Sequence, residues 1–216
     1  MDNILIEKIQ NSDIENVASV LTDAFETNPA YAIIFKKENL RKDGLFWVFK
    51  TSLILNNSKQ LLTRVVKEKD TEKIIGTFTL IPPKGIKNNI LIYSKIGLLH
   101  FISKYGIKSL TRMLSLDNRN KSSLANSIRV SEYYYLSMVA IRKEYRGTGI
   151  GSYVITQAIK ELVSSNPACK LMGLTTQLPE NVTFYSRLGF EKLGEGYINF
   201  RGDKYYNYNM KLSIPL

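Results

Sequence analysis

Cysteine, histidine and tryptophan are almost absent from this 216-residue sequence, which contains one of each. The single cysteine, Cys169, excludes an internal disulfide and suits a reducing compartment, so we expect a cytoplasmic protein. At the edge of an expected strand, it is more typical of a small core residue than of a nucleophile. The single histidine, His100, falls within an expected helix, and an ordinary role in that helix is favoured over a catalytic one. We expect no metal site.

Long apolar runs are missing as well, because no stretch reaches the length of about 18 uncharged apolar residues that a membrane helix needs. Residues 1–8 lack the basic and then apolar pattern of a signal peptide. We therefore expect neither a secretion signal nor a membrane partner. A helix lying on a membrane surface near residues 98–102 is the less favoured alternative to a helix packed on protein.

Acidic residues are outnumbered: 30 lysines and arginines against 19 aspartates and glutamates give a net charge of +11. The basic residues are scattered along the chain, and no zinc-finger, helix-turn-helix or RNA-binding motif accompanies them. We therefore expect no nucleic-acid partner. A solvated basic surface that steers a phosphate-bearing small molecule is the favoured interpretation.

Hydrophobic patterning predicts one α/β domain over residues 1–216, without repeats or linkers. Strands are expected at 4–9, 60–67, 73–81, 133–141, 168–176, 190–200 and 204–214. Helices are expected at 14–25, where Pro29 ends the helix, and at 39–55, 150–162 and 179–188. Residues 84–130 are expected to form a helical insert, with helices near 92–105 and 107–126. Trp47 could belong to the core or line a substrate cleft.

The most informative segment joins an apolar strand (133–141) to a helix through the glycine-rich sequence RGTGIG at 146–151. A strand, a glycine turn and a helix together direct free backbone N–H groups and a helix dipole at an anion. A nucleotide-triphosphate loop would need Lys-Ser/Thr after Gly151, and a dinucleotide fold would need Gly-x-Gly-x-x-Gly. Neither spacing is present. A pyrophosphate-sized anion site is therefore favoured over a turn that only reverses the chain.

Two segments resemble a known family. RGTGIG, preceded by Val-Ala-Ile at 139–141, resembles the Arg/Gln-x-x-Gly-x-Gly/Ala acyl-CoA signature of the GNAT superfamily of N-acetyltransferases. NVTFYSRLGF at 181–190 resembles the family segment Asn-x-x-x-Tyr-x-x-x-Gly-Phe. The layout is most similar to small-molecule acetyltransferases of the puromycin N-acetyltransferase type. The resemblance implies an α/β (α+β) GNAT-type domain: a mixed, mostly antiparallel sheet of six to seven strands flanked by helices, with the insert before the motif strand.

The resemblance also implies acetyl-CoA as the acyl donor. The pyrophosphate would meet backbone amides of the glycine turn, and the pantetheine arm would pair with main-chain groups of the preceding strand, from which the next strand must splay away. Asn181 would meet the pantetheine or a water, and Tyr185 would act as general acid to the departing sulfur. The implied cofactor-binding residues are Val139, Ala140, Ile141, Arg146, Gly147, Thr148, Gly149, Ile150, Gly151, Ser152, Asn181 and Tyr185.

The acceptor side is less defined. Strand alternation is expected to place Tyr135, Ser137, Val139 and Ile141 on one face, and none is a carboxylate, although some relatives carry glutamate on this strand. Asp23 or Glu26 could supply a base, and Glu132 is disfavoured by its position. Phe25, Tyr135, Ser137 and Thr175 are the candidate substrate residues. Thr175 and Lys143 depart from the family pattern, where glutamate and proline are common.

Together these features predict an enzyme that transfers an acetyl group from acetyl-CoA to a primary amine of a small molecule, by direct attack on the thioester, as a monomer or homodimer. Two alternatives remain open. One is a protein that binds acyl-CoA as a sensor without turnover. The other is an acetyltransferase acting on protein or peptide amines, which the basic charge balance disfavours.

Overall fold

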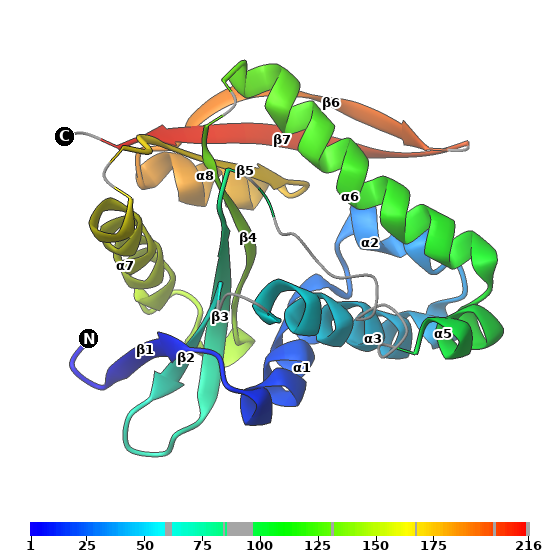
Figure 1. Cartoon of the computed structure of the whole chain (residues 1–216), viewed down its shortest axis with the longest axis horizontal. Helices are drawn as coiled ribbons and strands as arrows, with labels where there is room; N and C mark the ends of the chain where they lie inside the picture. Colours follow the sequence, from blue (N-terminus) through cyan, green and yellow to red (C-terminus); the bar gives the residue numbers. More distant parts are fainter. Residues whose placement is uncertain are drawn as a thin grey trace.

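The centre of the fold is a mixed sheet of seven strands in the order β1-β2-β3-β4-β5-β7-β6 (Figure 1). The computed structural model describes residues 1–58, 62–83, 85, 97–130, 132–166, 168–200 and 202–214. Neighbouring strands are antiparallel except β4 and β5, which run parallel. This confirms the expected sheet. The strands are β1 (Ile4–Lys8), β2 (Thr63–Glu68), β3 (Ile74–Ile81), β4 (Tyr134–Ile141), β5 (Leu171–Thr176), β6 (Glu191–Phe200) and β7 (Asp203–Ser213).

Helices cover both faces of this sheet (Figure 1). On one face a core containing Leu21, Phe49 and Phe101 is covered by α1 (Ile14–Phe25), α2 (Pro29–Ile34), α3 (Glu38–Asn57), α5 (Leu98–Tyr105) and α6 (Ile107–Ile128). On the other face α7 (Ile150–Ser165) and α8 (Pro179–Arg187) pack over a second core that includes Leu136 and Met172. The helical connection between β3 and β4 therefore belongs to the same layer as α1.

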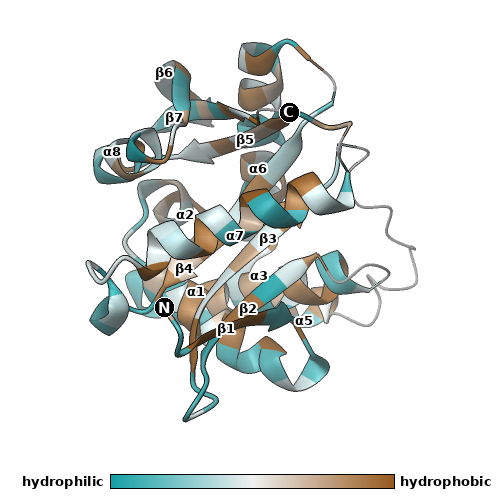
Figure 2. Cartoon of the chain, turned by 90° about the vertical axis from the view of Figure 1, so that its left-hand side faces the viewer, coloured by the Kyte–Doolittle hydropathy of each residue, from teal (hydrophilic) through white to brown (hydrophobic). Residues whose placement is uncertain are grey.

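The helix after the glycine turn has the predicted periodicity. Val154, Ile155, Ala158 and Leu162 of α7 are fully buried, and they share one helical face that packs on the strands. α7 lies across the sheet with this apolar face inward (Figure 2). The strand, turn and helix order that the sequence predicts is confirmed.

Two other expectations need comment. Pro29 does not only follow the first helix: α1 ends at Phe25, and Pro29 is the first residue of α2, where its missing N–H is no loss. In the insert, α5 and α6 confirm two helices over 98–128, while residues 92–96 of the expected first helix lie outside the described residues. Residues 60 and 61 of the expected second strand also lie outside them.

Two irregularities of β4 shape the centre of the sheet. β4 pairs with β5 only at Tyr134–Met172 and Tyr135–Gly173, so the two strands separate beyond Tyr135. In addition, the register with β3 shifts between the pairs Thr79–Ser137 and Thr77–Ala140, and Met138 has a positive φ of 49°. This is a β-bulge, which inserts one residue into the alternation.

The bulge corrects one expectation. Tyr135, Ser137, Val139 and Ile141 do not share a face, because the alternation changes at Met138. Met138 and Ala140 pack in the core under α1 and α3, whereas Val139 and Ile141 pack in the core under α7. Tyr135 and Ser137 therefore face the opposite side of the sheet from Val139 and Ile141.

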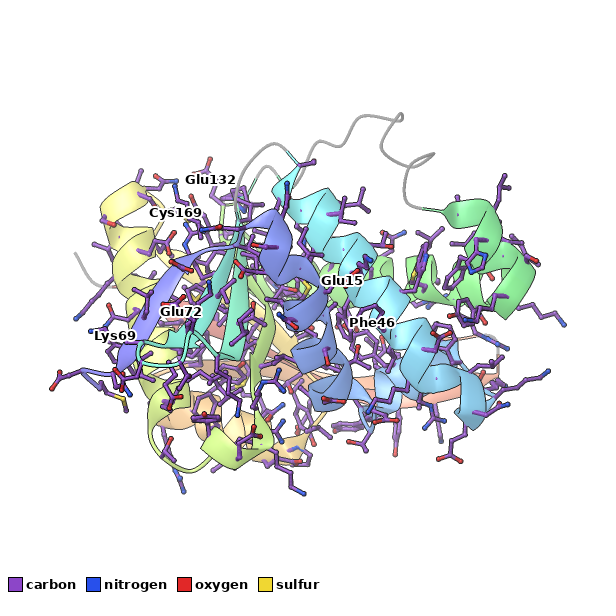
Figure 3. All side chains as sticks on the ribbon, turned by 90° about the horizontal axis from the view of Figure 1, so that it is seen from below. Glu15, Phe46, Lys69, Glu72, Glu132 and Cys169 are labelled. Atoms are coloured by element: carbon purple, nitrogen blue, oxygen red, sulfur yellow. The ribbon has the colours of Figure 1, made fainter. Side chains whose placement is uncertain are left out.

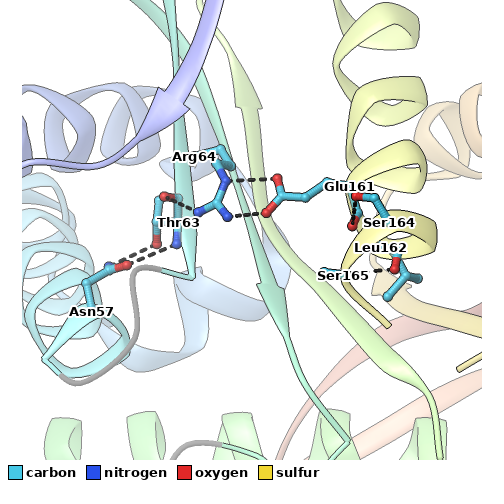
Figure 4. Close-up of polar contacts among 7 residues, drawn as sticks. All are labelled: Asn57, Thr63, Arg64, Glu161, Leu162, Ser164 and Ser165. Carbon is cyan, nitrogen blue, oxygen red and sulfur yellow. Dashed lines mark hydrogen bonds and ion pairs between the residues drawn. The ribbon is translucent and has the colours of Figure 1, made fainter. Parts of the chain in front are cut away.

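A polar contact attaches α7 to strand β2 of the sheet (Figure 4). The Nε of Arg64 in β2 donates to Oε2 of Glu161 at 2.8 Å, and a terminal nitrogen of the same guanidinium meets Oε1 of Glu161. The backbone N of Thr63 in turn donates to Oδ1 of Asn57 at the end of α3. Helices on opposite faces of the sheet are thus tied to one strand.

Candidate active site

The separation of β4 from β5 opens a small cavity of about 80 Å³. Seven of the residues singled out in the sequence line it together, namely Phe25, Tyr135, Ser137, Val139, Thr175, Asn181 and Tyr185. They come from α1, β4, β5 and α8. Residues that are up to 160 positions apart in the chain therefore meet at the point where the parallel strands part.

Tyr185 reaches this cavity from α8. Its ring is held by edge contacts to Phe184 and Phe190, with ring centroids 5.0 and 5.4 Å away, and the residue is only 8% exposed. Its hydroxyl has no hydrogen-bond partner among the described residues, and burial raises the pKa of this phenol well above its usual value. Tyr185 is therefore a protonated donor with a free O–H in a cavity.

Tyr135 and Thr175 face each other across the gap between the strands. The Tyr135 hydroxyl and Thr175 Oγ1 are 3.2 Å apart, a hydrogen bond that joins β4 to β5 where their ladder has ended. Burial raises the pKa of Tyr135 to about 12, and the hydrogen bond with Thr175 acts in the opposite direction. Asn181 anchors α8 at the same place, because its Nδ2 donates to Thr176 Oγ1 at 3.0 Å.

A chain of buried amides borders the cavity, and sequence reasoning did not predict it. Asn28 Nδ2 donates to Gln177 Oε1 (3.1 Å), Gln177 Nε2 to Asn207 Oδ1 (2.8 Å), and Asn207 Nδ2 to Asn209 Oδ1 (2.9 Å). Asn209 Nδ2 then meets hydroxyls of α6. A sequence signal existed: asparagines at alternate positions of a tyrosine-rich strand place two amides on its inward face.

The glycine turn lies at the other end of β4. Gly147 and Gly149 have φ values of 79° and 83°, which a residue with a Cβ rarely adopts, and a Cβ at Gly147 would point into open space. α7 begins at Ile150 with no side-chain cap, so its first N–H groups have no side-chain acceptor. The Nε of Arg146 donates to the Ile141 carbonyl at 2.9 Å, which fixes the turn against the strand end.

Three aliphatic residues among the predicted cofactor residues have side chains buried in the two cores, namely Ala140, Ile141 and Ile150, which are 4%, 9% and 7% exposed. Only the main chain of these residues can meet a ligand. Thr148, Gly151 and Ser152 belong to the turn and the first helical turn. Gly151 is close-packed, because a Cβ there would lie 3.3 Å from the Phe184 ring.

A larger pocket of about 800 Å³ adjoins the small cavity between α3, α6 and β4. Tyr31, Tyr135, Ser137 and Met138 line both, so the two spaces share a wall. Aromatic and apolar side chains dominate the larger pocket. Asp117 and Lys121 of α6 are the charged members of its described lining. Trp47 meets both expectations, since it lines this pocket and also packs on Phe101 with ring centroids 4.3 Å apart.

The carboxylates considered from the sequence lie elsewhere. Asp23 is on the surface, where it pairs with Lys42 at 2.9 Å, and neither Asp23 nor Glu26 lines the described walls of the two spaces. Glu132 lies beside Cys169, whose Sγ is 3.8 Å from the Glu132 carbonyl oxygen (Figure 3). Asp117 is therefore the carboxylate that the structure brings to the site and that the sequence did not indicate.

Two further properties concern the described residues as a whole. No group of three or more histidine, cysteine, aspartate or glutamate side chains among them is placed to hold a metal ion. No helix in the described ranges is long and apolar enough to cross a membrane.

Residues 101–212, more than half of the chain, match the family described as Acetyltransferase (GNAT) domain. The chain belongs to this family and is an acyltransferase.

Solved structures share the fold. A structure described as histone acetyltransferase HPA2 and related acetyltransferase, from Corynebacterium glutamicum, is 17% identical, with 99% of this chain and 98% of that chain covered and a TM-score of 0.64. A mosquito arylalkylamine N-acetyltransferase-like protein is 13% identical, with 98% and 100% covered and a TM-score of 0.62. At these identities the likeness shows the fold alone.

A curated protein from Dictyostelium discoideum, described as a probable serine/threonine-protein kinase, is 20% identical over 195 residues. The match covers 84% of this chain and 20% of that protein, so the chain spans about a fifth of the length of this relative.

Proposed function

We propose that the protein transfers an acetyl group from acetyl-CoA to a primary amine of a small molecule. The observation that carries the proposal is the separation of β4 from β5 beyond Tyr135, with the free hydroxyl of Tyr185 in the resulting cavity. Main-chain groups of β4 that face this gap are available to a peptide-like ligand, since a buried polar backbone needs partners. The shared fold with an arylalkylamine N-acetyltransferase-like protein supports an acceptor of small size.

Acetyl-CoA fits the residues present. The open space above Gly147 and the uncapped start of α7 suit a pyrophosphate, because N–H groups and the helix dipole both favour negative charge there. The main chain of Val139 and Ile141 would pair with the amides of the pantetheine arm, and Asn181 would hold the arm from α8. A thioester bound in this way supplies the acetyl group.

Tyr185 is assigned the role of general acid. As the amine nitrogen bonds to the acetyl carbon and the carbon–sulfur bond breaks, the sulfur needs a proton, and the amine loses one to solvent or to a nearby base. The raised pKa of Tyr185 keeps its phenol protonated at neutral pH, and no described residue accepts a hydrogen bond from its O–H. A donor with these two properties is what thiolate departure requires.

The test compares thiol release and acetyl-CoA binding in wild type and Tyr185→Phe. We expect Tyr185→Phe to lower kcat by about 10²- to 10⁴-fold, the usual contribution of a positioned general acid. Calorimetric binding of acetyl-CoA should stay within a few-fold of wild type, because the ring remains. Tyr197→Phe is the control, because Tyr197 is 60% exposed on β6. This substitution should leave kcat and the affinity for acetyl-CoA unchanged.

Other outcomes separate the alternatives. Full activity in Tyr185→Phe would remove the assigned role while leaving acetyl transfer intact. Acetyl-CoA binding without thiol release across a panel of amines would instead favour a sensor of acyl-CoA. Turnover confined to peptide amines would favour the protein-directed alternative.

A further inference from the structure

The 800 Å³ pocket between α3, α6 and β4 has the size and lining of a small-molecule site. Ligand pockets generally measure roughly 300–1,000 Å³ and combine an apolar lining with a few polar groups. Here Tyr31, Trp47 and Phe49 supply aromatic surface, and Leu110 and Met113 of α6 supply aliphatic surface. Such a pocket favours a ligand with an apolar body, because burying that body removes apolar area from water.

This pocket ends at the place where an acceptor must react. Tyr135, Ser137 and Met138 form part of its wall and also part of the wall of the cavity that contains Tyr185. A molecule in the larger pocket can therefore present one end to the gap between β4 and β5. Its remaining part would lie along α3 and α6.

One carboxylate lies near that end. Asp117 lines the larger pocket, and its charge helps to raise the pKa values of Tyr31 and Tyr135, the two tyrosines of the shared wall, although burial is the larger cause for both. Asp117 is paired with Lys121 at 2.7 Å, but both side chains are about half exposed. Exposed pairs within one helix are weak, so an arriving ammonium group can compete with Lys121.

We propose that this pocket is the acceptor site and that Asp117 recognises the ammonium group of a mono-amine carried on an aromatic or branched aliphatic body. The inference rests on the proposed acetyl transfer for its reaction, but not for its binding. A polyamine fits less well, because the described lining offers one carboxylate and Lys121 would repel a second cation. A folded protein surface fits poorly into a pocket of this volume.

Binding can be measured without turnover, because Trp47 is the sole tryptophan of the chain and lines the pocket. We expect 2-phenylethylamine to change the Trp47 fluorescence saturably. Putrescine, a diamine without an apolar body, should have little effect at the same concentration. Asp117→Asn should weaken the 2-phenylethylamine response by about tenfold or more, the usual cost of losing a charged hydrogen-bond partner. Lys121→Gln should strengthen it, because the competitor of the ammonium is gone.

Kinetics with acetyl-CoA supply the second readout. We expect kcat/KM for 2-phenylethylamine to exceed that for putrescine by about tenfold or more, and Asp117→Asn to act mainly by raising KM, since it removes a binding interaction. Asp43→Asn is the matched control, because Asp43 also pairs with a lysine, at 2.6 Å, but does not line the described pocket.

The two proposals fail in different ways. Absence of thiol release with every amine, together with a normal fluorescence response, would contradict acetyl transfer but support the pocket. Acetyl transfer to putrescine at equal or higher efficiency, or an unchanged 2-phenylethylamine response in Asp117→Asn, would overturn the acceptor assignment. A fluorescence response to neither amine would overturn it as well.

Discussion

Gly149 combines a backbone conformation that favours glycine with a position beside the proposed anion site. Its φ of 83° lies in the region that side chains rarely adopt, and it immediately precedes α7. A Cβ at this position would lie 3.3 Å from the Met1 methyl group. A side chain here would therefore either strain the turn or occupy space beside the first N–H groups of the helix.

We predict that Gly149→Val weakens acetyl-CoA binding by about tenfold or more while the protein stays folded, because the backbone strain costs only about 1–2 kcal/mol. Titration calorimetry measures the affinity, and circular dichroism checks the fold. Gly202→Val is the control: Gly202 has a φ of 86° in the turn between β6 and β7. Equal loss of affinity in both variants would contradict a role for the glycine turn in binding.

At the scale of elements, the position of α7 depends on more than its apolar face. The helix carries the proposed anion site at its first turn, and Glu161 near its other end is held by the Arg64 guanidinium from β2 (Figure 4). The Arg64 and Glu161 side chains are 13% and 33% exposed, so this pair is partly shielded from water. Hydrogen bonds between such charged groups are stronger than those on an open surface.

We predict that Glu161→Gln lowers the free energy of unfolding by about 1.5–3 kcal/mol, the range for hydrogen bonds to charged groups. Urea denaturation measures the change. Glu144→Gln provides the control, because Glu144 pairs with Lys73 at the surface, where both side chains are about half exposed, and its loss should have little effect. A larger loss in Glu144→Gln than in Glu161→Gln would contradict this account.

Elements with strong local signals could be predicted from the sequence. The periodic apolar positions of α7 and the glycine turn before it required no tertiary information, and the hairpin of β6 and β7 was marked by its turn. The bulge at Met138 could not be predicted, because methionine carries no preference for a positive φ and the irregularity depends on pairing with β3. It decides that Tyr135, rather than Val139, faces the larger pocket.

The residues of the candidate site also divide into those that the sequence could predict and those that depend on tertiary packing. Tyr185 and Asn181 belong to a contiguous segment whose spacing resembles a family pattern, so they could be named in advance. Asp117 could not, because its relevance comes from lining the same pocket as Tyr135, which lies 18 residues further along the chain. Tyr31 was likewise hidden, since it lies in α2, a helix that sequence patterning did not predict.

At the scale of the whole molecule, one buried tyrosine (Tyr185) and two half-buried tyrosines (Tyr31 and Tyr135) lie together around the gap in the sheet. Burial raises the pKa values of Tyr31, Tyr135 and Tyr185 above that of a free phenol. The folded state therefore holds these protons more tightly than the unfolded state does. The resulting stability is fully present below the unfolded pKa of about 10 and is lost as the pH rises through the folded values.

We predict that the free energy of unfolding decreases as the pH rises from about 10 toward 12, the value to which the pKa of Tyr135 is raised. Tyr135→Phe removes one of these groups, so its stability should fall less steeply over this window. Urea denaturation at pH 8, 10 and 11 (about 4, 2 and 1 units below that value) would measure the slopes. An identical slope in Tyr135→Phe and wild type would exclude Tyr135 as a contributor.

The buried amide chain beside the cavity has a fixed polarity. Asn28 Oδ1 accepts from the backbone N of Ala30 at 2.9 Å, so only its Nδ2 can donate to Gln177. Each amide then determines the orientation of the next, through Asn207 to Asn209. One main-chain N–H at the start of α2 thus sets the direction of four side chains, and reversing any one of them would place like atoms against each other at the contacts of that side chain. The loop before α2, the segment after β5, strand β7 and α6 are consequently joined by one set of amide orientations.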